Sequence, residues 1–512
     1  MPTTPSRRDF LAEVGRGTLL AALGPAFAAD FGLAAEPAEP ARLHFGELEP
    51  LVGFLQETPV ARLQPALLNK LREGVTLDRL VAAGVLANAR SFGGEDYVGF
   101  HTLMALGPAR QMAAALPAAR QPLPVFKVLY RNTQRIQEHG GSTAEVLQPV
   151  TPATGSPGLA ELRAAVRGRD TAMAEATFAA LMVQDAEAGF NALLECVQEN
   201  PEVHRTVLPY RAWDLLDLVG REHATTLLRL SLRYCLEAES RRRPEWEQTG
   251  RLLGRLFDEH KLHGREPGTR ALDDAAVETL ERDIFQGTPE DAAAAVASAL
   301  GDGVAPRDVG EAVALAANAI VLRDRGRPPE WESPGKPAGS VHGDSIGVHA
   351  SDSVHAWRNL ARVSRGRNVF ACLILAAWQV ARDRGGQPFT EWPPVPSAYQ
   401  MRGVTASEPG ALLDQLDAHL RANLQGHAAA VVTRWNALGL PDGPLWSLLL
   451  QYAVSEDGAL HAEKYYQTCR DEFARARPAF RGRHLVALAR VTASECGRPA
   501  PGQDEARRLL GV

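Results

Sequence analysis

The chain has 512 residues, of which 45% are hydrophobic and 23% are charged, so it can bury a sizeable core, and this composition argues against global disorder. Its formal net charge is −6, and no long basic run occurs, which argues against nucleic acid as the main partner. The length allows two to four domains or one large helical domain.

The first residues have the pattern of a twin-arginine export signal. Arg7 and Arg8 form the arginine pair, a modestly apolar stretch follows at 17–27, and Ala26-Phe27-Ala28 matches a small-x-small cleavage site. We therefore predict a Tat signal over 1–28, a flexible segment over 29–44, a helical domain over 45–512, and a periplasmic or otherwise extracytoplasmic mature protein. The Tat export machinery would be one partner. No later stretch is long and apolar enough to predict a membrane span.

The pattern of hydrophobic residues is helical from about residue 45 onward. Apolar residues recur every three or four positions over 77–90, 171–198, 223–240 and 274–285, and alternating β-type runs are nearly absent. Two helix starts are marked, at Asn200-Pro201-Glu202 and at Thr288-Pro289-Glu290. The sequence predicts an all-α fold with one large domain. Its five cysteines are widely spaced and suggest no disulfide framework.

Two stretches rich in proline and glycine interrupt the helical pattern, at 325–340 and 385–403. Both contain aromatic residues, so we expect ordered crossover loops that pack on the surface or line a cleft.

The segment Gly343-Asp-Ser345-Ile-Gly347 matches the G-x-S-x-G pattern of serine hydrolases. A nucleophile elbow requires a strand before the serine, and the preceding residues contain no apolar strand run. The same residues fit a loop that ends in a helix N-cap at Asp344 or Ser345. We predict that Ser345 is not a nucleophile, and a serine hydrolase is the least favoured function.

Histidines are the most informative polar residues for a metal site. His349 and His355 lie six residues apart and would differ by about 120° around a helix, and His342 lies before the expected helix, so these residues cannot form one site alone. Any metal site must recruit ligands from other helices. His101, His204 and His461 are such candidates, although each also fits a buried or capping residue.

His461 is followed at helical spacing by Lys464, one of five lysines, and by Tyr465. A buried lysine can be kept as a carbamate, which is an anionic oxygen ligand. The same spacing also fits a solvated helix face. No H-E-x-x-H motif occurs.

The segments GFHTLMAL, VHRTVLPYRAWDLL, VHASDSVHAWRNL and LHAEKYY resemble an uncharacterised group of bacterial helical proteins and, more remotely, the questin oxidase-like family. The family holds non-haem iron on widely spaced histidines, with a modified lysine in some members, and oxidises aromatic polyketides. The resemblance implies metal ligands at His101, His349, His461 and Lys464, and at His204 by order along the chain. Ser351 and Asp352 stand where the family pattern has threonine.

Together these observations predict a metal-dependent oxidoreductase, a non-haem iron oxygenase that acts on an aromatic or apolar small molecule. Fe(II) is the expected metal, with Zn or Mn as alternatives. His355 and Tyr465 would orient ligands or donate protons. The alternative is an exported helical binding or scaffold protein whose histidines are structural. The two interpretations differ in one geometric expectation: His101, His204, His349, His461 and Lys464 converge only in the first.

Overall fold

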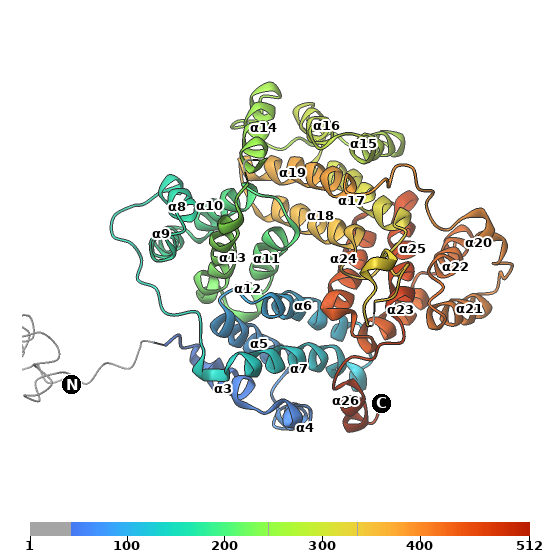
Figure 1. Ribbon diagram of the computed structural model, residues 1–512, viewed down its shortest axis with the longest axis horizontal. Helices are drawn as coiled ribbons and strands as arrows, with labels where there is room; N and C mark the ends of the chain where they lie inside the picture. The colour runs from blue at the N-terminus through green and yellow to red at the C-terminus, as the bar shows by residue number, and fades with distance from the viewer. Residues whose placement is uncertain (1–41, 244, 335) are drawn as a thin grey trace, which may run out of the picture. The chain divides into compact units, whose positions relative to one another are not determined.

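The computed structural model describes residues 42–243, 245–334 and 336–512, and the expected signal segment 1–28 lies outside them. Residues 45–512 form one compact unit that is all-α, as predicted (Figure 1). No β-strand occurs in these described ranges, which contain only three isolated bridges. None of their helices is both long enough and apolar enough to cross a lipid bilayer.

The helices of the N-terminal half are α3 (Glu49–Glu57), α4 (Val60–Arg72), α5 (Leu77–Phe92), α6 (Tyr97–Ala114), α7 (Pro122–His139), α8 (Leu159–Arg167), α9 (Thr171–Gln184), α10 (Ala186–Gln198), α11 (Val203–Asp214), α12 (Leu216–Val219), α13 (Ala224–Ala238) and α14 (Glu245–Glu259). Those of the C-terminal half are α15 (Asp274–Gln286), α16 (Pro289–Gly301), α17 (Pro306–Arg323), α18 (Ile346–Val363), α19 (Arg367–Arg384), α20 (Ala398–Arg402), α21 (Pro409–Arg421), α22 (Gln425–Ala437), α23 (Gly443–Ser455), α24 (His461–Arg475), α25 (Pro478–Glu495) and α26 (Gln503–Leu510). Short 3-10 turns join several of them.

Local sequence explains where several helices begin. Thr288 caps α16 through a capping box with Asp291, as predicted. The predicted start at Asn200 is wrong, because Glu202 is the N-cap and its carboxylate accepts hydrogen bonds from the backbone N–H groups of His204 and Arg205. The helical pattern over 171–198 is two helices, because Asp185 caps a new helix instead of continuing the first.

The two crossover loops are ordered and meet at one cavity. The first joins α17 to α18 and contains a 3-10 turn at Pro329–Trp331. The second follows α19, and its predicted end at residue 403 is too late because α20 occupies Ala398–Arg402. Side chains from both loops line a cavity of about 570 Å³. The loops therefore line a cleft, one of the two arrangements expected from their composition.

Four long helices determine where the candidate site lies. α6 packs against α11 and α24, and α18 also packs against α11 and α24. In Figure 1 these four helices lie in the centre of the ribbon, with α5 and α7 below them and α17 and α19 above. The four helices thus form a closed cycle of neighbours, and each carries one candidate histidine.

Candidate metal centre

Each of the four candidate histidines lies near the beginning of its helix. His101 is in the second turn of α6, whose N-cap is Asp96. His204 and His349 lie in the first turns of α11 and α18, and His461 is the first residue of α24. Ser345 is the N-cap of α18, with its hydroxyl oxygen accepting a hydrogen bond from the backbone N–H of Val348. The helix-start interpretation of the GDSIG segment therefore agrees with the structure.

The four imidazole rings converge, although they span 361 positions in sequence (461 − 101 + 1). Ring centres are 4.9 Å apart for His101 and His204, and 5.9 Å apart for His204 and His349. The cycle closes through 5.4 Å between His349 and His461 and 5.2 Å between His461 and His101. Metal–nitrogen bonds of about 2.0–2.1 Å would place the ring centres of neighbouring ligands roughly 4.5–5.5 Å apart. The observed ring is close to this size.

The Nε2 atoms of the four rings are the atoms available to a ligand. The Nε2 atoms of His349 and His461 lie 3.3 Å apart, a separation expected for two nitrogen ligands of one ion. The Nε2 atoms of His101 and His204 are buried and, within the described part of the chain, have no hydrogen-bond partner. A buried nitrogen without a partner is costly unless a ligand satisfies it.

The opposite ring nitrogens are held in place by oxygen atoms. The Nδ1–H of His101 donates to the carbonyl oxygen of Tyr97 at 2.7 Å, and that of His461 to the carbonyl oxygen of Ala459 at 3.1 Å. His204 Nδ1 lies 3.5 Å from the Glu202 carboxylate. Metal-binding histidines are typically fixed in this way, because the hydrogen bond at Nδ1 leaves the Nε2 lone pair free.

As the side chains stand, the described residues contain no group of three or more His, Cys, Asp or Glu side chains arranged to hold a metal ion. The Nε2 atoms of His349 and His461 are at ligand spacing, but this pair is not joined by a third side chain in such an arrangement within the described residues. The cluster is therefore close to a binding geometry without having adopted it.

Burial keeps three of the four histidines uncharged. It lowers the pKa of His349 to about 3, assisted by the nearby His204 and Lys464. It also lowers the pKa values of His101 and His461, where the charge of Lys464 adds to the effect. These three rings are neutral at neutral pH, and neutral imidazole is the form that binds metals.

Lys464 lies beside the cluster, buried with 3% of its surface exposed. Burial lowers the pKa of Lys464 to about 8, although the nearby Asp352 opposes the shift. Asp352 is itself buried and accepts a hydrogen bond from the Thr468 hydroxyl at 2.8 Å. A fraction of Lys464 is therefore a neutral, nucleophilic amine near neutral pH. The solvated-face alternative for this lysine does not hold.

The structure places His355 and Tyr465 elsewhere. His355 Nε2 bonds the Asp471 carboxylate at 3.0 Å, and its ring packs against Tyr210. Tyr465 is buried, and burial raises its pKa with the Cys469 thiol beside it. The described contacts of both side chains are thus with other partners than the four histidines.

Two neighbours of the cluster were not predicted from the sequence. Glu202 is the N-cap of α11; burial opposes its ionisation, yet His204 and the Tyr234 hydroxyl bring its pKa to about 2. Tyr97 packs against His101 with tilted rings and meets His204 edge-on, with ring centres 4.4 and 5.6 Å away, while 60% of its surface is exposed. Their only signal in the sequence was closeness to a candidate histidine. Glu202 lies two residues before His204, and Tyr97 lies four residues before His101.

The cleft between the crossover loops lies next to the beginning of α18. Asp344 and Ser345 line it, and Trp331, Phe389 and Trp392 supply aromatic surface. Burial raises the pKa of Tyr97, and the negative charge of Asp344 adds to this effect. Because Asp344 lines the cleft, the cleft lies near the tyrosine ring that packs on the histidines. Gly343 packs directly against His461.

Comparisons with protein-family models, with curated proteins and with solved structures found no match to this chain.

Proposed function

We propose that His101, His204, His349 and His461, together with Lys464, bind a redox-active metal ion and that the protein is a metal-dependent oxidoreductase. The observation that carries the proposal is the convergence of four imidazoles whose Nε2 atoms face one another or have no partner within the described chain. Fe(II) fits a set of imidazole and anionic oxygen ligands, with Zn or Mn as alternatives. The metal, when bound, would supply a coordination position for O₂.

Lys464 completes the ligand set as a carbamate. Its neutral amine attacks CO₂, so that a bond forms between Nζ and carbon and one proton is released. The product carries a negative oxygen donor where an ammonium group would repel a cation. The lowered pKa of Lys464 and its burial beside the histidines support this role.

The neighbouring residues would orient and protect the site. Glu202 lies at His204 Nδ1 and favours the tautomer with a free Nε2. Tyr97 and Phe100 pack on His101 and His204 and exclude water from that side. The aromatic cleft lined by Trp331, Phe389 and Trp392 would hold the substrate, which we propose is an aromatic or similarly apolar small molecule.

The resemblance to the questin oxidase-like family supports the same proposal. The residues that it implies as ligands are the ones that lie together in the fold, including His204, which was assigned only by its order. We accordingly propose a non-haem iron oxygenase, exported through a Tat signal to the periplasm.

Metal analysis of protein purified without a His tag tests the proposal. We expect about one ion per chain in the wild type and almost none in H349A, because removal of one ligand of a buried site abolishes retention. H139A is the matched control, since His139 is exposed at the end of α7 and far in sequence from every proposed ligand. Equal metal content in H349A and H139A would exclude the metal centre.

A further inference from the structure

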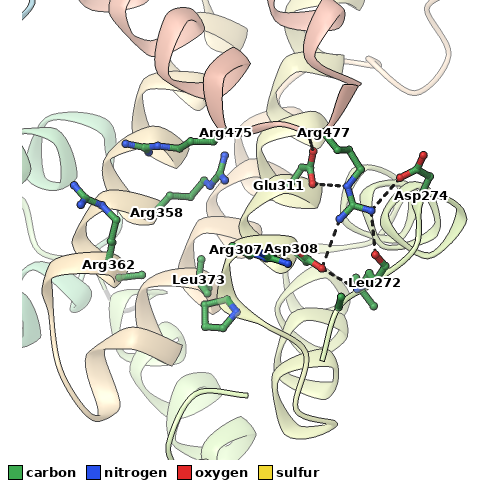
Figure 2. Close-up of a pocket in the computed structure, with 13 residues that line it drawn as sticks. Leu272, Asp274, Arg307, Asp308, Glu311, Arg358, Arg362, Leu373, Arg475 and Arg477 are labelled. Carbon is green, nitrogen blue, oxygen red and sulfur yellow. Dashed lines mark hydrogen bonds and ion pairs between the residues drawn. The ribbon is translucent and has the colours of Figure 1, made fainter. Parts of the chain in front are cut away.

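A second cavity, of about 790 Å³, lies at the other ends of α18 and α24, two of the four helices that carry the histidines (Figure 2). The last turns of α18 and the end of α24 form one side of it, and the beginning of α17 and the loop before α15 form the other. Its distinguishing feature is arginine: five arginine side chains line it.

On one side of this cavity the arginine charge is neutralised by carboxylates. Arg477 pairs with Glu311 at 2.9 Å, with Asp274 at 3.0 Å and with Asp308 at 3.5 Å. Figure 2 shows the three carboxylates grouped around this one guanidinium. The donors of Arg477 are therefore used, and this side offers little to an anion.

The opposite side has an excess of positive charge. Arg358, Arg362 and Arg475 lie together there (Figure 2), and Arg358 pairs with the buried Glu472. Within the described ranges no carboxylate forms an ion pair with Arg362 or Arg475. Both donate instead to the neutral Oδ1 of Asn359, at 3.5 and 3.0 Å.

The amide of Asn359 is fixed in this orientation. Its Nδ2 donates to the carbonyl oxygen of His355 at 2.8 Å, so its Oδ1 must face the arginines. One neutral oxygen thus serves two guanidinium groups, each of which has five N–H donors. Most of their donors remain available to a ligand in the cavity.

Crowding of like charges adds to the attraction for an anion. Burial lowers the pKa of Arg358 to about 9, and the positive charge of Arg475 contributes to the shift. An anion between these side chains would offset that repulsion. Guanidinium groups bind carboxylate and phosphate oxygens in a bidentate manner, which suits a doubly charged ligand.

The remaining lining of the cavity is apolar. Leu272, Pro306, Ala361 and Leu373 supply hydrophobic surface beside the charged side. We propose that this cavity is a binding site for a small organic dianion, a phosphate monoester or a dicarboxylate, whose oxygens are bound by Arg358, Arg362 and Arg475 and whose carbon skeleton rests on these apolar residues.

This site is separate from the histidine cluster. Nine residues of α18 separate His349 from Arg358, which corresponds to roughly 14 Å along the helix axis. On α24, His461 and Arg475 stand at opposite ends of the helix. The proposal does not depend on the metal centre, and H349A should bind the dianion as the wild type does.

Titration calorimetry in a buffer of low ionic strength without phosphate provides the test. The probes are phenyl phosphate and isophthalate, with benzyl alcohol as a neutral compound of similar size. We expect both dianions to bind and benzyl alcohol not to bind, and the tighter dianion identifies the ligand class. The proposal would be overturned if neither dianion binds, or if benzyl alcohol binds as tightly as the dianions.

The variants use arginines whose loss leaves the fold intact. R362Q/R475Q removes two exposed side chains, whereas Arg358 is avoided because its buried ion pair with Glu472 stabilises the fold. We expect at least tenfold weaker binding of phenyl phosphate. R251Q/R402Q removes the same charge from exposed positions on α14 and α20 and should bind as the wild type does. Equal weakening in both double variants would mean unspecific attraction and would refute the site.

Discussion

The replacement G343A should displace one proposed ligand without removing it. A Cβ atom added at Gly343 would lie 2.0 Å from Cβ and 2.7 Å from Cγ of His461. Carbon atoms in ordinary contact are about 3.5–4.0 Å apart, so one of the two segments must move by roughly 1.5 Å or more. Gly343 is held by the hydrogen bond of its N–H to Glu495 at 3.0 Å, and therefore the His461 ring is expected to take part of the shift.

A displacement of this size is larger than a metal site tolerates. Ligands must stay within about 0.5 Å of their productive positions, and even the loss of a residue that only orients a ligand weakens metal binding about 10- to 100-fold. We expect G343A to bind Fe(II) or Zn(II) at least 100-fold more weakly than the wild type. Overpacking should also lower the free energy of unfolding by about 1–3 kcal/mol.

The measurement is metal affinity by competition with a chelator, together with urea unfolding of the metal-free protein. G189A is the control, because the Cβ added to Gly189 in α10 would lie 2.6 Å from the sulfur of Met182 in α9, away from the histidines. It should lose similar stability and retain its metal affinity. If G343A keeps wild-type affinity while its stability falls, His461 does not hold the metal in the manner proposed.

Two further predictions concern buried titratable groups. Burial, with the charges of Arg358 and Arg483, lowers the pKa of His484 to about 3 from about 6.5 in the unfolded chain. The stability from this neutral histidine is present above pH 6.5 and is lost as the pH falls toward 3. At pH 5 this loss is about 2 kcal/mol. The decrease in unfolding free energy from pH 7.5 to pH 5 should therefore be about 2 kcal/mol smaller in H484Q than in the wild type. An equal decrease in the two proteins would contradict this prediction. The carbamate at Lys464 should give a carbonyl NMR resonance when protein loaded with diamagnetic Zn(II) is equilibrated with ¹³C-bicarbonate. The resonance should be absent in K464R, and its absence from the wild type would leave a histidine-only site.

The helices were predictable because the pattern that specifies them is local. Hydrophobic periodicity and the Thr288 capping box depend on residues within one or two turns of each other. The errors are local as well. At Asp185 the hydrophobic periodicity continues although one helix ends and another begins. Before α11, the Asn-Pro pair at 200–201 has the pattern of a helix start, but the N-cap is Glu202.

The sequence named the candidate ligands, and a shared metal required them to converge, but the packing that brings their helices together could not be worked out from the sequence. Which helices become neighbours depends on the packing of apolar faces throughout the domain, and no motif encodes it. His355 illustrates the difference. It is also a histidine of α18, but six positions along a helix change the direction of the side chain by about 120°, and its ring contacts Asp471 instead. The arginine cavity was not predicted because its residues are ordinary surface residues until α17, α18 and α24 come together.

The positions of the histidines on their helices bear on the charge that the site requires. His204, His349 and His461 lie in first helical turns, where the helix dipole places partial positive charge. An imidazole binds a metal in its neutral form and so adds nothing to balance a divalent cation, and an uncompensated buried charge is costly. Negative charge must therefore come from the neighbours of the ring. Glu202, with its lowered pKa, is ionised at His204, and the carbamate would convert Lys464 from a repelling cation to an anion. We therefore expect the charge state of Lys464, as well as each histidine, to determine whether the proposed centre retains a divalent cation.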